Sequence, residues 1–193
     1  MDTAQIDAAL SRAVGAKGVP GVVALAAADN GVVYEGAFGS RDSAAGSAMT
    51  LDTVFRIASM TKAVTSVAAM QLVEQSKLEL DKPIAAVLPE LASPQVLEGF
   101  DDAGAPRLRP AKRPITLRHL LTHTAGFGYE FFSSELMRYV QKTGAPSIFT
   151  GELAALNMPL LFDPGERWAY GINTDWVGRA VEAVSGIVWW IRV

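Results

Sequence analysis

The order of apolar and polar positions in the first forty residues predicts a helix followed by two strands. Residues 2–14 place apolar side chains on one helical face, with Asp and Arg side chains between them. After a break at residues 15–21, residues 22–28 form an apolar run typical of a buried strand. Asn30-Gly31 predicts a tight turn, because this pair readily supplies positive φ angles, and residues 32–38 predict the returning strand.

Beyond the hairpin, the pattern is mainly helical. Residues 60–76 are rich in helix-forming apolar residues on all sides, which predicts a buried central helix. Residues 93–114 carry Pro and Gly and are predicted to form a loop. The other predicted helices are Leu117–His123 after a Thr116 cap, 134–142, 150–158, and 175–184, the last one capped by Asn173 or Thr174 and closed by Gly186.

Composition indicates a globular protein and excludes several function classes. Of the 193 residues, half are apolar and 19% are charged, and the net charge is −3, so no basic field exists to gather nucleic acid or an anionic membrane. The basic residues from Arg107 to Arg113 stand among prolines, and a solvated loop is expected there rather than a binding patch. There is no cysteine, which excludes disulfides, thiolate chemistry and Cys-zinc sites.

The N-terminus has no secretory leader pattern, and no apolar run is long enough to span a bilayer. A soluble, cytoplasmic protein is therefore expected, unless a leader has been removed.

Ser59-Met60-Thr61-Lys62 is the motif that carries chemistry. Residues three apart share one face of a helix, so the Lys62 amine is expected near the Ser59 hydroxyl. Burial could lower the pKa of the lysine enough for it to accept the serine proton. The Ser59 backbone N–H, at the start of a helix, could hold an oxyanion. A serine and lysine in this spacing also occur at ordinary helix starts, so the motif alone leaves both readings open.

The wider sequence resembles the serine β-lactamase and penicillin-binding-protein-like superfamily, and it is most similar to class C β-lactamases and the related family VIII esterases. The resemblance runs from about Ile6 to Gly186 and rests on residues 53–62, 19–22, 78–84, 115–126 and 164–170. It implies an α+β fold of the β-lactamase/transpeptidase type. Residues 1–62 would form the N-terminal part of the α/β domain, and residues 63–186 the mostly helical domain. Residues 187–193 form an atypical tail.

The same resemblance implies that Tyr170 joins Ser59 and Lys62 as a catalytic residue. In this family such a tyrosine accepts the serine proton and passes it to the leaving group. Class C enzymes have Tyr-x-Asn, but here Ile172 stands in the place of the asparagine, and Asn173 follows one residue later and reads as a helix cap. This departure favours the esterase branch.

The remaining candidate residues are given structural roles. His119 and His123 are four residues apart, but Leu120 stands where a zinc-protease motif needs Glu, and no third ligand is evident. There is also no G-x-S-x-G elbow for a Ser-His-Asp triad. Aromatic residues near the implied pocket are expected in the core or the cleft wall, or against an acyl group: Phe127, Tyr129, Phe131, Phe132 and Trp168.

The third element that the resemblance implies, a late strand with Lys-Thr-Gly or a variant, does not follow Tyr170. The C-terminal strands of the sheet are therefore expected to be missing, which would leave the hairpin with an open edge that promotes self-association. The prediction is a serine hydrolase, most simply a carboxylesterase, acting on a small-molecule ester or β-lactam without cofactor, metal, nucleic acid or membrane. The alternatives are β-lactamase or D-alanyl-D-alanine peptidase activity, and an inactive fragment or a module that needs a C-terminal partner.

Overall fold

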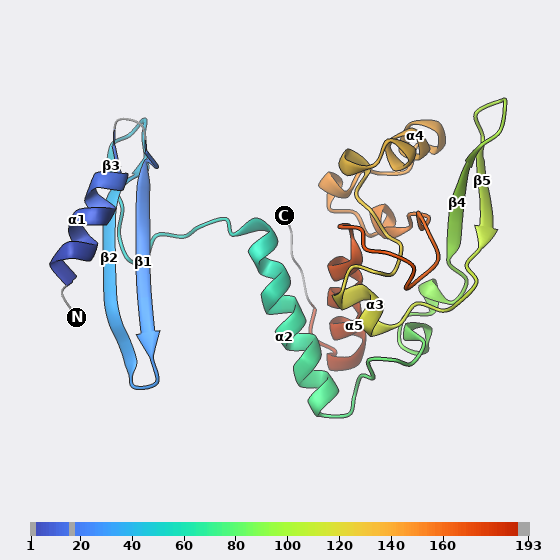
Figure 1. The fold of residues 1–193 in the computed structure, drawn as a ribbon, viewed down its shortest axis with the longest axis horizontal. Helices are drawn as coiled ribbons and strands as arrows, with labels where there is room; N and C mark the ends of the chain where they lie inside the picture. The colour runs from blue at the N-terminus through green and yellow to red at the C-terminus, as the bar shows by residue number, and fades with distance from the viewer. Residues whose placement is uncertain (1–2, 16–17, 189–193) are drawn as a thin grey trace. The chain divides into compact units, whose positions relative to one another are not determined.

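The computed structural model describes residues 3–15 and 18–188, which fall into two compact units, Met1–Arg56 and Ile57–Val193 (Figure 1). This division comes before the expected boundary after residue 62. The reason is local, since the turn that holds Ser59 continues directly into a helix of the second unit. Ser59 and Lys62 therefore belong with the helical unit. Of the atypical tail, residues 189–193 lie outside the described residues.

The first unit confirms the predicted helix and hairpin. Strands β1 (Gly21–Ala28) and β2 (Gly31–Asp42) pair antiparallel from Gly21↔Gly39 to Ala28↔Gly31, and Gly31 takes a positive φ of 118°. Among the described residues the sheet order is β1-β2-β3, so β1 is an edge strand and self-association through it stays a prediction. The elements are α1 (Thr3–Ala13), β1 (Gly21–Ala28), β2 (Gly31–Asp42) and β3 (Ser47–Ala48).

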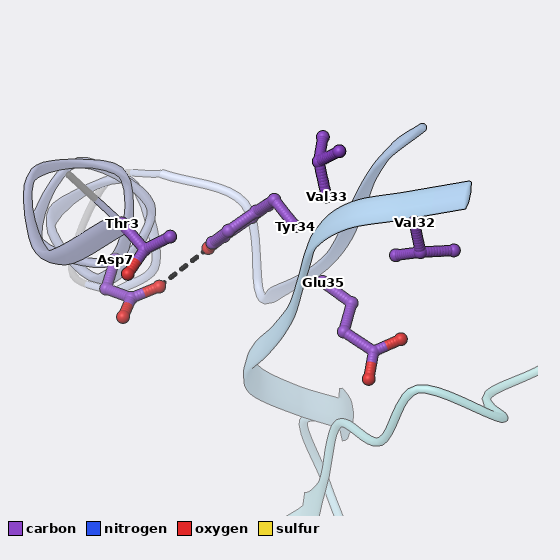
Figure 2. Close-up of a pocket in the computed structure, with 6 residues that line it drawn as sticks. All are labelled: Thr3, Asp7, Val32, Val33, Tyr34 and Glu35. Carbon is purple, nitrogen blue, oxygen red and sulfur yellow. Dashed lines mark hydrogen bonds between the residues drawn. The ribbon is translucent and has the colours of Figure 1, made fainter. Parts of the chain in front are cut away.

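A hydrogen bond between side chains ties α1 to this sheet. Figure 2 shows Tyr34 of β2 pointing toward α1, where its hydroxyl donates to Asp7 Oδ1 at 2.7 Å. Burial, this hydrogen bond and the Asp7 charge raise the pKa of Tyr34 to about 12. The pair borders an open hollow of about 410 Å³, lined by Thr3, Asp7, Val32, Val33, Tyr34 and Glu35. None of Ser59, Lys62 and Tyr170 contributes to it.

The second unit is built around α5 (Asn173–Ser185), which packs against α2 (Thr61–Glu74) and α3 (Leu117–Leu121). Its buried core includes Ala69 and Leu72 of α2, Leu120 of α3 and Val177 of α5. The helices of this unit are α2 (Thr61–Glu74), α3 (Leu117–Leu121), α4 (Ser134–Thr143) and α5 (Asn173–Ser185), with short 3-10 turns between them.

Two helix ends confirm the capping signals. Thr116 caps α3 by accepting the backbone N–H of His119, and the His119 ring accepts the N–H of Thr116 in return. Gly186 ends α5 in the left-handed conformation that glycine adopts without strain. The prediction that α2 is buried on all sides is wrong, since Val64 and Val67 are more than half exposed while Ala69 is fully buried.

The loop predicted for residues 93–114 is instead a hairpin of β4 (Gln95–Phe100) and β5 (Pro106–Pro110). Its prolines stand at the ends of β5, in a sheet of only two strands, where a missing backbone donor is tolerated. Arg109 is not a solvated loop residue either. It donates bidentately to buried Asp163 at 3.0 and 2.8 Å and also to Glu98 at 2.9 Å.

Two further helix predictions need correction. Residues 150–158 contain the 3-10 turn Leu153–Leu156 and the end of the 3-10 turn Ile148–Thr150 rather than an α-helix. Neither Asn173 nor Thr174 caps α5, because the helix begins at Asn173 after Ile172, with no side-chain cap. No helix in the described ranges is both long and apolar enough to cross a membrane, and the cytoplasmic location stays an expectation.

Candidate active site

Ser59 lies in a 3-10 turn, Ala58–Met60, that runs directly into α2. Ala58, the residue before it, has a φ of 45°, a left-handed conformation that is uncommon outside glycine. The side chain of Ser59 is exposed, whereas that of Lys62 is half-buried on the first turn of the helix. The chain therefore presents a hydroxyl to solvent beside a lysine held against the protein.

The structure brings together all three residues that the sequence predicts for the site. The Tyr170 hydroxyl donates to Ser59 Oγ at 2.8 Å. Lys62 Nζ donates to the same oxygen at 3.3 Å and lies 4.9 Å from the centre of the Tyr170 ring. One nucleophile candidate thus has two possible proton partners within hydrogen-bond reach.

The charge on Lys62 argues against its acting as the base. Burial acts to lower the pKa of Lys62, but hydrogen bonding and charge interactions with Tyr170 and Tyr129 outweigh it and raise the pKa. A lysine with a raised pKa stays an ammonium ion at neutral pH, where it has no lone pair to accept a proton. The alternative in which burial makes Lys62 the base is therefore disfavoured.

Tyr170 shows the opposite behaviour. Burial acts to raise its pKa, but hydrogen bonding with Lys62 and Ser59 and the charge of Lys62 together lower the pKa below the ordinary value of 10. The phenol is thus moved toward the phenolate that can take a proton from Ser59. The hydrogen bond and the charge of Lys62 thus favour the ionised form of Tyr170.

Two further groups near Lys62 were not given a catalytic role from the sequence. Tyr129 is buried, and its ring centre lies 5.7 Å from Lys62 Nζ. Asp175, in the first turn of α5, has a pKa raised by burial and partly lowered again by the charge of Lys62. The sequence gives no reason to assign Asp175 to the site. Acidic residues are common in the first turn of a helix because they interact favourably with the helix dipole.

A band of aromatic side chains extends outward from Tyr170. Ring centres of Tyr129, Trp168 and Phe132 lie 5.5, 6.3 and 6.4 Å from that of Tyr170. Phe131 continues the band, 4.6 Å from Phe132. We call Tyr129, Phe131, Phe132, Phe149 and Trp168 the aromatic shelf. Phe127 is separate from it, since it is buried and stacks on Trp176.

The two histidines do not form a metal site with other residues. No group of three or more His, Cys, Asp or Glu side chains within the described ranges could hold a metal ion. His119 belongs to the cap of α3, as described above, while the His123 ring lies 5.0 Å from that of Tyr170. His123 is thus the histidine beside the site.

Ile172 and Asn173 both point into the protein. Ile172 is 1% exposed and Asn173 has no exposed surface, and both are therefore unavailable to a substrate at the Ser59 hydroxyl. The Asn173 amide faces His123 Nδ1 at 3.1 Å instead.

Comparison with known proteins places this geometry in a family context. A family model described as Beta-lactamase matches residues 6–189. A monacolin J acid methylbutanoyltransferase of Aspergillus terreus is 38% identical over 189 residues, which cover 94% of this chain and 46% of that protein. A lovastatin esterase of Penicillium rubens is 39% identical over 169 residues, which cover 86% of this chain and 42% of that protein.

Solved structures are also similar to this chain. The unliganded simvastatin synthase of Aspergillus terreus matches with a TM-score of 0.83 at 38% identity, over 97% of this chain and 50% of that one. A penicillin-binding protein homologue of Pyrococcus abyssi matches at 24% identity with a TM-score of 0.63, which supports the fold alone. The chain spans about half the length of the curated relatives it matches.

Proposed function

We propose that this chain, which belongs to the β-lactamase family, carries the acyl-accepting serine of an enzyme that cleaves or transfers esters through an acyl-serine intermediate. The observation that carries the proposal is the arrangement of Ser59 Oγ, with Tyr170 OH at 2.8 Å and Lys62 Nζ at 3.3 Å. A nucleophile beside a base that a third group supports is the arrangement that activates a serine hydroxyl.

In the proposed reaction, the Tyr170 phenolate takes the proton of the Ser59 hydroxyl while Ser59 Oγ bonds to the ester carbonyl carbon. The bond from that carbon to the leaving alkoxide then breaks, and Tyr170 returns the proton to the departing oxygen. A water or an acceptor alcohol next gives its proton to Tyr170 and attacks the acyl carbon. The bond from that carbon to Ser59 Oγ then breaks, and Tyr170 returns the proton to Ser59 Oγ, which restores the hydroxyl and the phenolate. Lys62 remains an ammonium ion throughout and stabilises the phenolate in each half-reaction.

An ester, rather than a β-lactam, is the proposed substrate class. Lactamases of class C, which this chain resembles, hold the substrate amide with an asparagine two residues after the tyrosine. Here that position is Ile172, which lies in the core, and the neighbouring Asn173 is fully buried. An ester has no amide N–H, so its binding does not depend on such a partner.

The aromatic shelf supports a bulky apolar acyl or alcohol group in that ester. Phe132, Trp168 and Phe149 are 70%, 64% and 73% exposed, so these rings offer apolar surface to a ligand rather than to the core. The methylbutanoyltransferase and the lovastatin esterase are similar over most of this chain, and their names agree with a bulky ester.

The first test is active-site labelling of the intact chain. The chain is incubated with an ethyl fluorophosphonate, and the modified residue is located by peptide mass spectrometry. Label on Ser59 that disappears in Ser59→Ala is expected, and label elsewhere would refute the proposal. Absence of label on the wild type would instead support the alternative of an inactive module.

The second test is substrate choice. We expect faster turnover of aryl esters than of a chromogenic cephalosporin, and faster turnover of esters with a bulky apolar acyl group than of acetyl esters. A preference for the cephalosporin would favour the β-lactamase alternative, and release of D-alanine from a D-alanyl-D-alanine peptide would favour the peptidase.

A further inference from the structure

His123 is a strained residue directly behind Tyr170. Its φ of 56° lies in the left-handed region, which few non-glycine residues occupy, and such strain persists only where surrounding contacts maintain it. Here such contacts include those of His123 with Ala169 and Tyr170, two residues that we call the tyrosine segment. The carbonyl of His123 accepts the N–H of Ala169 at 2.9 Å, and its ring lies 5.0 Å from that of Tyr170.

Asn173 orients the ring of His123 through a hydrogen bond to its Nδ1 atom. The amide nitrogen of Asn173 lies 3.1 Å from His123 Nδ1 and 3.4 Å from the carbonyl oxygens of both Phe127 and Ala169. A carbonyl oxygen only accepts, so the atom facing these two groups must be the NH₂ of the amide. That NH₂ donates to His123 Nδ1, which places the ring proton on Nε2.

The hydrogen bonding of Asn173 is incomplete for a residue that serves stability alone. Its side chain is fully buried, yet its Oδ1 has no hydrogen-bond partner among the described residues. An unpaired buried amide oxygen destabilises a folded protein, and an apolar residue of similar size would avoid that cost. The contacts that Asn173 does make are those of its NH₂ group with His123 Nδ1 and with the carbonyl oxygens of Phe127 and Ala169.

We propose that Asn173 and His123 are positioning residues that hold the ring of Tyr170 against Ser59, a role that rests on the function proposed above. Asn173 orients the His123 ring, and that ring limits where the Tyr170 ring can lie. The His123 carbonyl holds Ala169, the residue before Tyr170. Since a misplacement of about 1 Å in reacting groups costs roughly 100-fold in rate, even a small relaxation of the ring should be measurable.

The test is a double-mutant cycle on the rate of Ser59 labelling by an ethyl fluorophosphonate. His123→Asn removes the ring and keeps a residue type that tolerates the left-handed region. We expect it to slow labelling about tenfold in the wild-type background and less than twofold in the Tyr170→Phe background, because no base remains to be positioned. Equal slowing in both backgrounds, or no slowing in either, would overturn the proposal.

A second measurement does not depend on reactivity. In a chain labelled with ¹³Cζ-tyrosine, Asn173→Ala should shift the Tyr170 resonance, although the hydrogen bonds of the Asn173 side chain go to His123, Phe127 and Ala169, and should leave the Tyr34 resonance in place. In a His123→Asn background, the same substitution should shift it less, because only the contact of the Asn173 amide with the Ala169 carbonyl then acts on the tyrosine segment. An unmoved Tyr170 resonance in a chain that still melts cooperatively would overturn the positioning role, even if no serine is labelled.

The matched control is His119→Asn, at the histidine that caps α3. It tests the loss of a histidine ring from the neighbouring segment, so its effect is expected on the melting temperature and not on the labelling rate. Labelling slowed equally by His119→Asn and His123→Asn would assign both effects to loss of local structure and would overturn the proposal.

Discussion

The hydroxyl of Tyr170 lies 2.8 Å from Ser59 Oγ, although 111 residues separate the two in sequence. Ser59 stands just before α2 and Tyr170 just before α5, and these helices pack against each other. The packing of two helices in one unit therefore sets the distance between the two oxygens. Both residues lie in the second unit of the chain.

Tyr170→Phe tests the proposed base. The substitution removes one hydroxyl from a half-buried ring, and proton transfer by a positioned side chain contributes about 10²- to 10⁴-fold to a rate. We expect labelling of Ser59 to slow within that range, with the melting temperature unchanged. Labelling at the wild-type rate would remove Tyr170 from the mechanism.

Lys62→Met tests the role of the ammonium ion through pH. Labelling requires the unprotonated phenol, so its rate rises with pH through the lowered pKa of Tyr170. Without the Lys62 charge, burial raises that pKa unopposed by the cation, so the rise should move to higher pH. The matched control Lys77→Met, on an exposed lysine beyond the end of α2, should leave the profile in place. A profile that stays in place in Lys62→Met would contradict the assigned role.

The sequence predicts the fold best where a local signal decides the structure. The Thr116 cap, the Gly186 helix end and the turn before Gly31 each depend on a few neighbouring residues, and all three are found as expected. The hairpin of β4 and β5 was missed because Pro106 and Pro110 suppress the strand signal, and the pairing that stabilises it joins separate segments.

The residues of the site also differ in whether a local signal in the sequence predicts their contacts. The Ser59–Lys62 spacing is local and predicts the 3.3 Å contact, whereas Tyr170 could be proposed only through the family resemblance. Asn173 was assigned as a cap because local propensity favours that role. Its actual partner, His123, is 50 residues away, and no pattern in one sequence reveals such a pair.

Tyr34→Phe tests the contact that ties α1 to the sheet. Burial, and after it the hydrogen bond to Asp7 and the Asp7 charge, raise the pKa of Tyr34 to about 12, above the value near 10 of an unfolded chain. The protonated phenol in this contact therefore stabilises the fold fully below about pH 10. That contribution is lost as the pH rises toward 12. Urea unfolding of the intact chain, followed by circular dichroism, should show Tyr34→Phe less stable than wild type at about pH 9 and nearly equal to it at about pH 12. An equal gap at both pH values would contradict the contact.

Phe127 lies in the core and Phe132 in the aromatic shelf, so substitutions at these two residues test the two regions separately. Phe127 is 2% exposed and stacks on Trp176, whereas Phe132 is 70% exposed beside Tyr170. Truncating a buried phenylalanine costs about 3–5 kcal/mol, so Phe127→Ala should lower the free energy of unfolding by an amount of that order. Phe132→Ala should change it by no more than about 0.5 kcal/mol, as exposed substitutions usually do.

The same pair tests the proposed ligand. If the shelf binds a bulky apolar group, Phe132→Ala should slow labelling of Ser59 by a phosphonate that bears a large alicyclic group. Labelling by an ethyl phosphonate, which is too small to reach across the shelf, should not change. The quantity to compare is the ratio of the two labelling rates, because any general loss of reactive protein cancels in it. A ratio unchanged by Phe132→Ala would leave the shelf without a role in recognition, because removal of an exposed ring that a ligand contacts must weaken binding of the ligand that covers it.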